Sequence, residues 1–306
     1  MFKNVIVRVP STTVCDGITS ADLGKPIYTK AAAQHETYVS ALTKTGVNVT
    51  VLEPHKEFPD SCFIEDDALC TSKCAIITRP GAPTRRKEVE LQDLSDVLHK
   101  FYDHVERIQS PGTIEAGDIM MVGDHFYIGL SARTNEEGAQ QMINILEKYG
   151  LSGETVPLKE VLHLKTGLSY IENNNLLING QFLNDPRFDK FNKIVVDDDE
   201  AYGANSIWLN GYVLVPAGYP KTQKKIENLG YNHEVVDKAK FEEPKNARDL
   251  ALEIVSLMKQ ENQNKLNRIQ DEGKPLNNMP EGNDDGVNDE QKAANKILAF
   301  FKKGGK

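Results

Sequence analysis

The chain has 306 residues, a formal net charge of −9 and 39% hydrophobic residues, enough apolar material for a large core in one or two domains. The acidic balance argues against a nucleic-acid-binding surface and favours attraction of a cationic small molecule. The first residues, MFKNVIVRVPS, form an apolar run that is too short and too interrupted for a signal peptide or a membrane helix. We therefore expect a cytoplasmic protein with no nucleic-acid or membrane partner.

Strand patterns and helix patterns alternate along the first 237 residues. Apolar, β-rich runs recur at NVIVRVP, VNVTVLEP, CAIITRPG, DIMMVGDHFYIGL, NLLING, KIVVDDD and GYVLVPAG. Helical periodicity separates them, as in TNEEGAQQMINILEKYG, where Thr134 and Glu137 predict a capping box and Gly150 predicts the helix end. The alternation predicts an α/β fold built of several small sheet-and-helix units.

The stretch FPDSCFIEDDALC, residues 58–70, alternates as a strand does but carries acids where a buried strand would be apolar. These acids are Asp60, Glu65, Asp66 and Asp67. A carboxylate at the edge of a core is costly unless a cation or hydrogen-bond donors compensate it. The stretch therefore predicts a cation-binding site, and a solvated acidic loop is the alternative.

The cysteines Cys15, Cys62, Cys70 and Cys74 are too few for a disulfide framework in a chain of this length, so we expect reduced thiols. A zinc site on the last three is the alternative. However, the chain has no C-x-x-C pair, so we expect buried structural thiols and no metal.

The composition changes after residue 237. Residues 238–261 have the pattern of one amphipathic helix. Residues 262–291 are rich in Asn, Asp, Glu and Gly, and we expect this segment to be disordered. Residues 292–306 predict a short helix that docks onto the body or onto a partner rather than onto a membrane. The sequence thus predicts one folded domain, residues 1–237, followed by these three segments.

Five stretches occur in order along the domain: FPDSCFIEDDALC, AIITRPGAPTRR, GTIEAGDIMMVGDHFYIGLSARTNEEGA, VLHLKTGLSYIENNNLLI and VLVPAGYPKTQKKIENLGY. Together they closely resemble the bacterial dimethylarginine dimethylaminohydrolases, which belong to the guanidino-group-modifying superfamily. The resemblance runs from residue 2 to about residue 237. It implies a pentein fold, a pseudo-fivefold α/β propeller of ββαβ units with the active site in its central channel. The implied reaction converts N-methylated arginine and water to citrulline and a methylamine, without a metal or an organic cofactor.

The resemblance also assigns roles to the acids and to one histidine. Asp60 and Asp66 would hold the guanidinium nitrogens of the substrate, and Glu65 would support them, because carboxylates match the planar fork of a guanidinium. His163, in LHLKTG, matches the catalytic histidine, which protonates the departing dimethylamine and then activates water. Glu115 matches the acid that orients this histidine and raises its pKa.

Two arginines and one loop complete the site that the resemblance implies. Arg85 and Arg133 match arginines that bind the amino-acid end of the substrate, and a surface salt bridge is the alternative for Arg85, which adjoins Arg86. Residues 16–26, DGITSADLGKP, match a mobile lid that places Ile18 over the channel.

The resemblance ends after NHEVVD. Family members continue with a strand that carries a Gly-Gly pair and the nucleophilic cysteine, but residues 238–306 contain no cysteine, and KAKFEEPKNARD has no glycine pair. The fifth unit is therefore predicted to be incomplete. Three explanations remain open: an inactive member whose C-terminus was replaced, a natural pseudoenzyme that acts through its tail, or recruitment of Cys62. The acids around Cys62 disfavour recruitment, because they would raise the pKa of its thiol.

The sequence thus predicts a dimethylarginine dimethylaminohydrolase family protein whose inherited reaction is impaired. The alternative is a non-catalytic protein that binds methylarginine or arginine. The expected partner is a small molecule with a guanidinium group, and the oligomeric state is left open, with a homodimer as one option.

Overall fold

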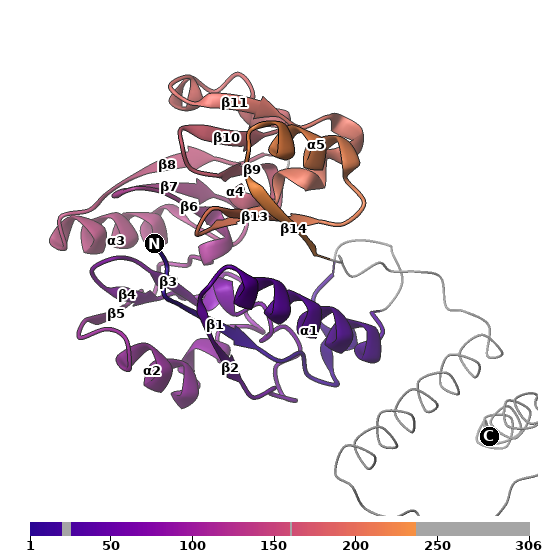
Figure 1. The fold of residues 1–306 in the computed structure, drawn as a ribbon. Helices are drawn as coiled ribbons and strands as arrows, with labels where there is room; N and C mark the ends of the chain where they lie inside the picture. The colour runs from indigo at the N-terminus through magenta and orange to yellow at the C-terminus, as the bar shows by residue number, and fades with distance from the viewer. Residues whose placement is uncertain (20–25, 160, 237–306) are drawn as a thin grey trace, which may run out of the picture. The chain divides into compact units, whose positions relative to one another are not determined.

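The computed structural model describes residues 1–19, 26–159 and 161–236. These residues form five small sheets, coloured in chain order in Figure 1. None of the helices in this part of the chain is long and apolar enough to cross a membrane. The segments predicted at residues 238–261, 262–291 and 292–306 lie outside the described residues.

Four of these sheets have three strands and share one pattern. Their strands, in chain order, are β3 (Ala68–Cys70), β4 (Ala75–Ile77) and β5 (Val105–Arg107); β6 (Ile119–Val122), β7 (His125–Leu130) and β8 (Ser152–Pro157); β9 (Leu168–Tyr170), β10 (Asn175–Ile178) and β11 (Asn192–Val195); and β12 (Ile207–Leu209), β13 (Tyr212–Pro216) and β14 (Asn232–Val236). In each sheet the first strand pairs antiparallel with the second, and the second pairs in parallel with the third.

Helical segments connect the second and third strands, as a parallel crossover requires. They are α2 (Gln92–His99), α3 (Glu136–Lys148), the two short 3-10 helices η5 (Gly180–Phe182) and η6 (Pro186–Phe188), and α5 (Pro220–Asn228). The 3-10 helix η3 (Glu88–Glu90) precedes α2. Each of the four units is therefore a ββαβ unit, as the sequence predicts.

The fifth sheet has two strands within the described residues. β1 (Asn4–Arg8) leads through the 3-10 helix η1 (Val14–Asp16) and the helix α1 (Tyr28–Lys44) to β2 (Asn48–Leu52), and β1 pairs with β2 in parallel. These two strands correspond to the second and third strands of the other sheets. The residues predicted to leave this unit incomplete, from 237 onward, lie outside the described part of the chain.

A short helix precedes the first strand of each complete unit. These helices are η2 (Ile64–Asp67), η4 (Ala116–Asp118), α4 (Leu164–Gly167) and η7 (Asp198–Ala204). Consecutive members contact each other, η2 with η4, η4 with α4, and α4 with η7. Residues of β3, β6, β9 and β12 line a cavity of about 300 Å³, so these first strands face a common interior, and the short helices form a row at their beginnings.

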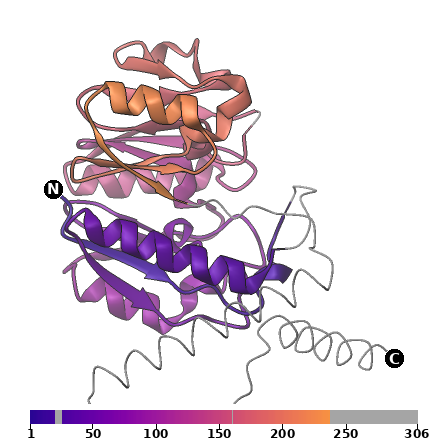
Figure 2. The same ribbon diagram turned by 45° about the vertical axis from the view of Figure 1, so that its right-hand side comes forward.

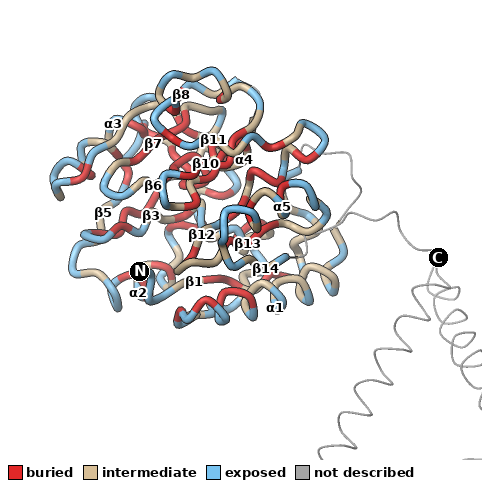
Figure 3. Tube along the Cα trace, turned by 45° about the horizontal axis from the view of Figure 1, so that its top comes forward, coloured by how far each residue is buried: buried red, intermediate tan, exposed pale blue. Residues whose placement is uncertain are grey.

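Apolar cores lie between each sheet and its helix, and the views in Figures 1 and 2 show the longer helices beside the sheets. In α3 the face formed by Ala139, Met142 and Leu146 is fully buried against Phe126 and Ile128 of β7. Figure 3 shows buried segments along the strands and on the inner side of the helices. Burial of such side chains contributes about 1.5–3 kcal/mol each to stability.

Two local predictions are wrong. Residues 58–67 are not a strand, because consecutive turns form there: Ser61 N donates to Phe58 O (3.1 Å) and Phe63 N donates to Asp60 O (2.9 Å), and η2 follows. Only the end of the stretch, β3, is extended.

The predicted capping box of α3 is also displaced. Asn135 is the N-cap, and its side chain accepts from Gly138 N. The hydroxyl of Thr134 instead donates to Asp118 at 2.6 Å. The helix ends at Lys148, and Gly150 follows with φ +75°, a conformation that favours glycine.

Candidate active site

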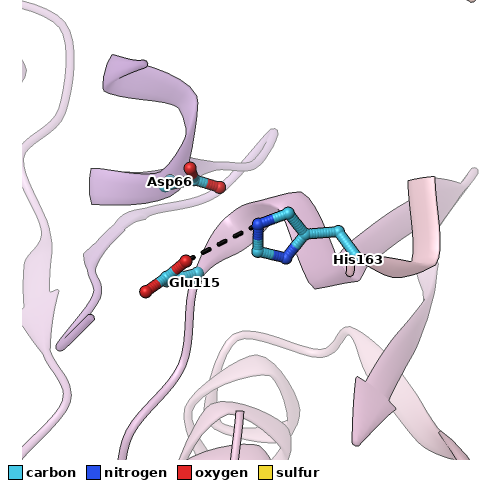
Figure 4. Close-up of side chains that lie close together, drawn as sticks. All are labelled: Asp66, Glu115 and His163. Carbon is cyan, nitrogen blue, oxygen red and sulfur yellow. Dashed lines mark ion pairs between the residues drawn. The ribbon is translucent and has the colours of Figure 1, made fainter. Parts of the chain in front are cut away.

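Three side chains from three different units converge at the row of short helices. Asp66 lies in η2, Glu115 directly precedes η4, and His163 directly precedes α4. One oxygen or nitrogen atom of each side chain lies within 4.8 Å of the others, and Figure 4 shows both acids beside the imidazole ring. Because each residue stands at the entrance to a first strand, the repeated fold itself brings them together.

The turn of η4 connects all three side chains. Gly117 N donates to Asp66 Oδ1 at 3.0 Å, and Glu115 Oε2 lies 3.6 Å from His163 Nε2. A Cβ atom at Gly117 would lie 2.6 Å from Asp66 Oδ1 and 3.1 Å from the Cγ of His163. A glycine is therefore needed at this position for the acid and the imidazole to approach the turn so closely.

The imidazole of His163 is surrounded by carboxylates, and 16% of its side chain is exposed. Burial by itself lowers the pKa of His163, because it disfavours the charged ring. The carboxylate of Asp118, 3.3 Å from Nδ1, together with the charges of Asp66 and Glu115, outweighs burial and raises the pKa above its ordinary value. The ring is thus suited to carry a proton near neutral pH.

Arg85 lies behind Asp66 and is only 4% exposed. Its three nitrogen atoms are all engaged: Nε donates to Glu88 Oε2 (3.0 Å), Nη1 to Asp66 Oδ2 (2.7 Å) and Nη2 to Phe63 O (3.1 Å). Burial lowers the pKa of Arg85, but the charges of Asp67, Asp66 and Glu88 outweigh burial. The pKa of Arg85 is therefore raised above its ordinary value. Arg85 is therefore a buried cation that fixes Asp66, and the surface salt bridge expected as its alternative is wrong.

Arg133 lies beside Glu115, and its guanidinium is less tightly held by protein groups than that of Arg85. Its Nη1 is 3.5 Å from Glu115 Oε1, and 19% of its side chain is exposed. Glu115 is almost fully buried and also accepts from Ala82 N at 3.2 Å. The long contact leaves Arg133 able to bind a further anionic group.

The remaining predicted residues lie around this cluster. Asp60 accepts from Ile18 N at 3.0 and 3.2 Å and is 7% exposed, whereas Ile18 is 47% exposed. Glu65 accepts from Lys165 Nζ at 2.6 Å, with 64% of its side chain exposed. The structure thus ties Asp60 to the beginning of the predicted lid and pairs Glu65 with a lysine. Residues 20–25 of the lid are outside the described part.

Charge distinguishes the ligands that the cluster could hold. The spacing of Asp66, Glu115 and His163 would admit a metal ion, but each acid already faces an arginine, Asp66 facing Arg85 and Glu115 facing Arg133. Flanking cations oppose a divalent ion more than a monovalent one. The two arginines therefore make the cluster less favourable for a divalent metal ion than for a monovalent cation.

The four cysteines all lie within the described residues as free thiols, and none belongs to the cluster. Burial, followed by the charge of Asp60, raises the pKa of Cys62 to about 11. The strand that would have placed Cys62 on one face with Asp60 and Asp66 is a turn. Cys62 is therefore a poor nucleophile near neutral pH.

The sequence reading did not single out Asp118 or Glu88, and it named Asp67 only as one of the acids of FPDSCFIEDDALC. All three are buried in or beside the cluster. The spacing of Glu115 and Asp118 in GTIEAGD was the available signal, because two acids flank a short turn that contains a glycine. Asp67 and Glu88 pair with Arg85, a contact between distant segments that no local pattern reveals.

Solved structures with a similar fold define the class. The N-terminal domain of ArgZ, an arginine dihydrolase from cyanobacteria, superposes with a TM-score of 0.70 at 15% identity over 79% of this chain and 93% of that one. SxtG, an amidinotransferase from Microseira wollei, superposes with a TM-score of 0.62 at 15% identity, over 78% and 90% of the two chains. The fold is thus a pentein α/β propeller.

Closer relatives define the family. The family described as N,N dimethylarginine dimethylhydrolase, eukaryotic, matches residues 16–185. The N(G),N(G)-dimethylarginine dimethylaminohydrolase of Pseudomonas aeruginosa is 57% identical over 242 residues, 79% of this chain and 94% of the relative. That of Streptomyces coelicolor is 31% identical over 78% of this chain and 92% of the relative. A Pseudomonas aeruginosa structure, a cysteine-to-serine variant complexed with citrulline, superposes with a TM-score of 0.77 over 79% and 94% of the two chains. The chain belongs to the dimethylarginine dimethylaminohydrolase family.

Proposed function

We propose that this chain binds N-methylated arginine at the cluster of Asp66, Glu115 and His163. The observation that carries the proposal is the convergence of two carboxylates and a protonatable imidazole within 4.8 Å. A guanidinium placed between Asp66 and Glu115 would donate its N–H groups to both acids, which is the pairing that a planar fork of donors favours. The citrulline complex of the Pseudomonas aeruginosa relative supports a ligand of this kind.

The surrounding residues take distinct roles in this proposal. Arg133, whose side chain contacts Glu115 at the long distance of 3.5 Å, binds the carboxylate of the ligand. Arg85 acts through Asp66, since its nitrogen atoms are occupied by protein groups. Asp60 and Ile18 line the approach, where the backbone amide of Ile18 fixes the carboxylate of Asp60. Glu65 supports these two residues through its contact with Lys165.

The inherited reaction is hydrolysis of the ligand to citrulline and a methylamine. His163 accepts a proton from the water that attacks the guanidinium carbon, and it donates this proton to the dimethylamine as the carbon–nitrogen bond breaks. No cysteine of the described part belongs to the cluster, and residues 237–306 contain none. Water must therefore attack the resonance-stabilised guanidinium carbon without a covalent intermediate. Turnover is consequently slow.

A non-catalytic binding protein is the second candidate. The observation that favours it is the contrast between the assembled acids and the partly buried Cys62 thiol, whose pKa is raised to about 11. In this reading methylarginine is recognised but not converted.

Comparison of a guanidinium ligand with an ammonium ligand tests the proposed recognition. Isothermal titration of asymmetric dimethylarginine should give saturable binding, and dimethyllysine, which has the same amino-acid end but no planar fork, should bind more weakly. Equal affinity for the two ligands, or no binding of either, would contradict the proposal. Citrulline in the same samples separates the two candidates, because slow accumulation supports hydrolysis and complete absence supports the binding protein.

A further inference from the structure

Asp118 is a fully buried carboxylate at the end of η4, three residues after Glu115. Three neutral donors hold it. Oδ2 accepts from the hydroxyls of Ser131 (2.7 Å) and Thr134 (2.6 Å), and Oδ1 accepts from the backbone N–H of Leu164 (3.1 Å). The donors come from the segment before α3 and from the start of α4, so both oxygens are fixed in direction.

The fixed Oδ1 of Asp118 points at the imidazole. It lies 3.3 Å from His163 Nδ1, and Nδ1 is buried without a hydrogen bond of good geometry to any described residue. A buried polar nitrogen without a partner is unfavourable. Asp118 is the acceptor within reach of that nitrogen.

The surroundings of Asp118 differ from those of the other buried acids in the site. Asp66, Asp67 and Glu88 share Arg85, and Glu115 faces Arg133. Within the described residues, no arginine or lysine pairs with Asp118. The cationic group available to this carboxylate is therefore the imidazolium of His163.

We propose that Asp118 is the positioning residue of His163: it accepts the Nδ1 proton, selects the tautomer with a free Nε2, and holds that nitrogen toward Asp66 and Glu115. The inference rests on the proposed function for the role of His163, because a free Nε2 is what the acid and base steps require. Nε2 accepts the proton of the attacking water, and the same nitrogen then gives that proton to the departing amine. Asp118 keeps its contact with Nδ1 throughout and stabilises the charged ring.

The role differs from that implied for Glu115. Glu115 Oε2 lies 3.6 Å from Nε2, on the side of the ring where Asp66 also lies. A carboxylate on the working nitrogen faces the ligand, whereas a carboxylate on the opposite nitrogen orients the ring. The geometry thus divides the two acids of GTIEAGD between ligand contact and ring orientation. The raised pKa of His163, to which the nearby carboxylate of Asp118 contributes, agrees with this division.

A purely structural role for Asp118 would predict something different. The carboxylate also joins the segment before α3 to α4, so its removal should lower stability under either account. A structural tie would leave the protonation of the His163 ring unchanged, whereas a positioning residue controls it. The decisive readouts are therefore the tautomer and the titration of His163.

The tautomer of the ligand-free wild-type protein decides the matter without a variant. The ¹⁵N chemical shifts of the His163 ring, measured above its titration midpoint, should show a protonated Nδ1 and an unprotonated Nε2. A ring protonated mainly at Nε2 would overturn the inference, because Glu115 would then be the acceptor that orients it. No ligand is present, so this result is independent of whether dimethylarginine binds.

A matched pair of variants measures the effect of the carboxylate. Asp118→Asn removes the charge at nearly constant size, and Asp124→Asn does the same at an exposed acid in the turn between β6 and β7. We expect Asp118→Asn to change the tautomer ratio by about tenfold or more, the effect of one charge-assisted hydrogen bond, and to lower the titration midpoint of His163. Asp124→Asn should change neither.

Indistinguishable His163 titrations and tautomers in the two variants would contradict the inference. If Asp118→Asn does not fold, the wild-type tautomer remains the test. A wild-type Nδ1–H tautomer in a protein that fails to bind dimethylarginine would retain Asp118 as the positioning residue and reject the proposed function instead.

Discussion

The helix α3 and the turn η4 belong to the same unit, yet they bury different kinds of side chain. α3 buries Ala139, Met142 and Leu146, whereas Glu115 and Asp118 are buried at η4. Apolar burial needs only a complementary surface, but buried acids need donors and cations from other segments. The difference suggests that changes in α3 affect stability alone, while changes around η4 affect the chemistry of the site.

The largest effect should come from the buried cation that holds the acids in place. Arg85→Ala leaves Asp66, Asp67 and Glu88 without their arginine, which should lower the free energy of unfolding by about 3–5 kcal/mol. Arg133→Ala is the matched control, because its partly exposed contact at 3.5 Å contributes about 1 kcal/mol or less. Urea denaturation compares them, and similar losses would mean that Arg85 is not the structural arginine.

A cavity beneath the helix α3 should lower the stability of the protein without altering its recognition of dimethylarginine. Leu146→Ala in α3 should lower the free energy of unfolding by about 2–5 kcal/mol, because the side chain is completely buried. Its affinity for dimethylarginine, measured where the variant is fully folded, should equal that of the exposed control Gln140→Ala. A weakened affinity would show that the two regions are coupled.

Loss of one charge at the site should do the opposite: it should weaken recognition of the ligand without a comparable loss of stability. Asp66→Asn keeps the shape of the side chain but replaces an acceptor of guanidinium donors with a neutral amide. We expect dimethylarginine affinity to fall by tens- to about a thousandfold, or about 2–4 kcal/mol. Glu65→Gln, at an exposed neighbour paired with Lys165, should have a smaller effect. Calorimetric titration checks both, and unchanged affinity in Asp66→Asn would remove Asp66 from the site.

The smallest expected effect is a pH dependence of stability that originates at one ring. The pKa of His163 is raised in the folded protein, so its contribution is fully present below the unfolded value near 6.5 and is lost as pH rises through the folded value. The difference in unfolding free energy between wild type and His163→Asn should therefore shrink with rising pH. Urea denaturation at pH 5.5 and pH 9 tests this sign, and a growing difference would contradict it.

Local sequence patterns predicted the helix α3 well, because the periodicity of apolar residues directly indicates which face of a helix is buried. The buried residues Ala139, Met142 and Leu146 of α3 are among those that its spacing indicates. The same reasoning misplaced the N-cap at Thr134. The hydroxyl of that residue donates to Asp118, which lies 16 positions away in the chain, and Asn135 caps the helix instead.

The site was less accessible to local reasoning. The family resemblance named Asp66, Glu115 and His163, and the structure brings them together, but no pattern in FPDSCFIEDDALC showed that turns would replace a strand. Arg85 was expected at the ligand and lies buried among acids. Such positions depend on contacts between units of the propeller, which spacing along the chain does not encode.

The most direct test of the central claim, that the chain binds dimethylarginine but converts it slowly, measures the heat of binding and the formation of citrulline on one sample. Dimethylarginine titrated into the purified chain should give saturable heat that is lost in Asp66→Asn, while citrulline should form far more slowly than the rate of about 1 per second typical of slower enzymes. Binding without fast turnover would agree with an intact acid cluster that lacks a reactive thiol. Citrulline formation at about 1 per second or faster would contradict the account, and loss of that activity in Cys62→Ser would identify the Cys62 thiol as the nucleophile.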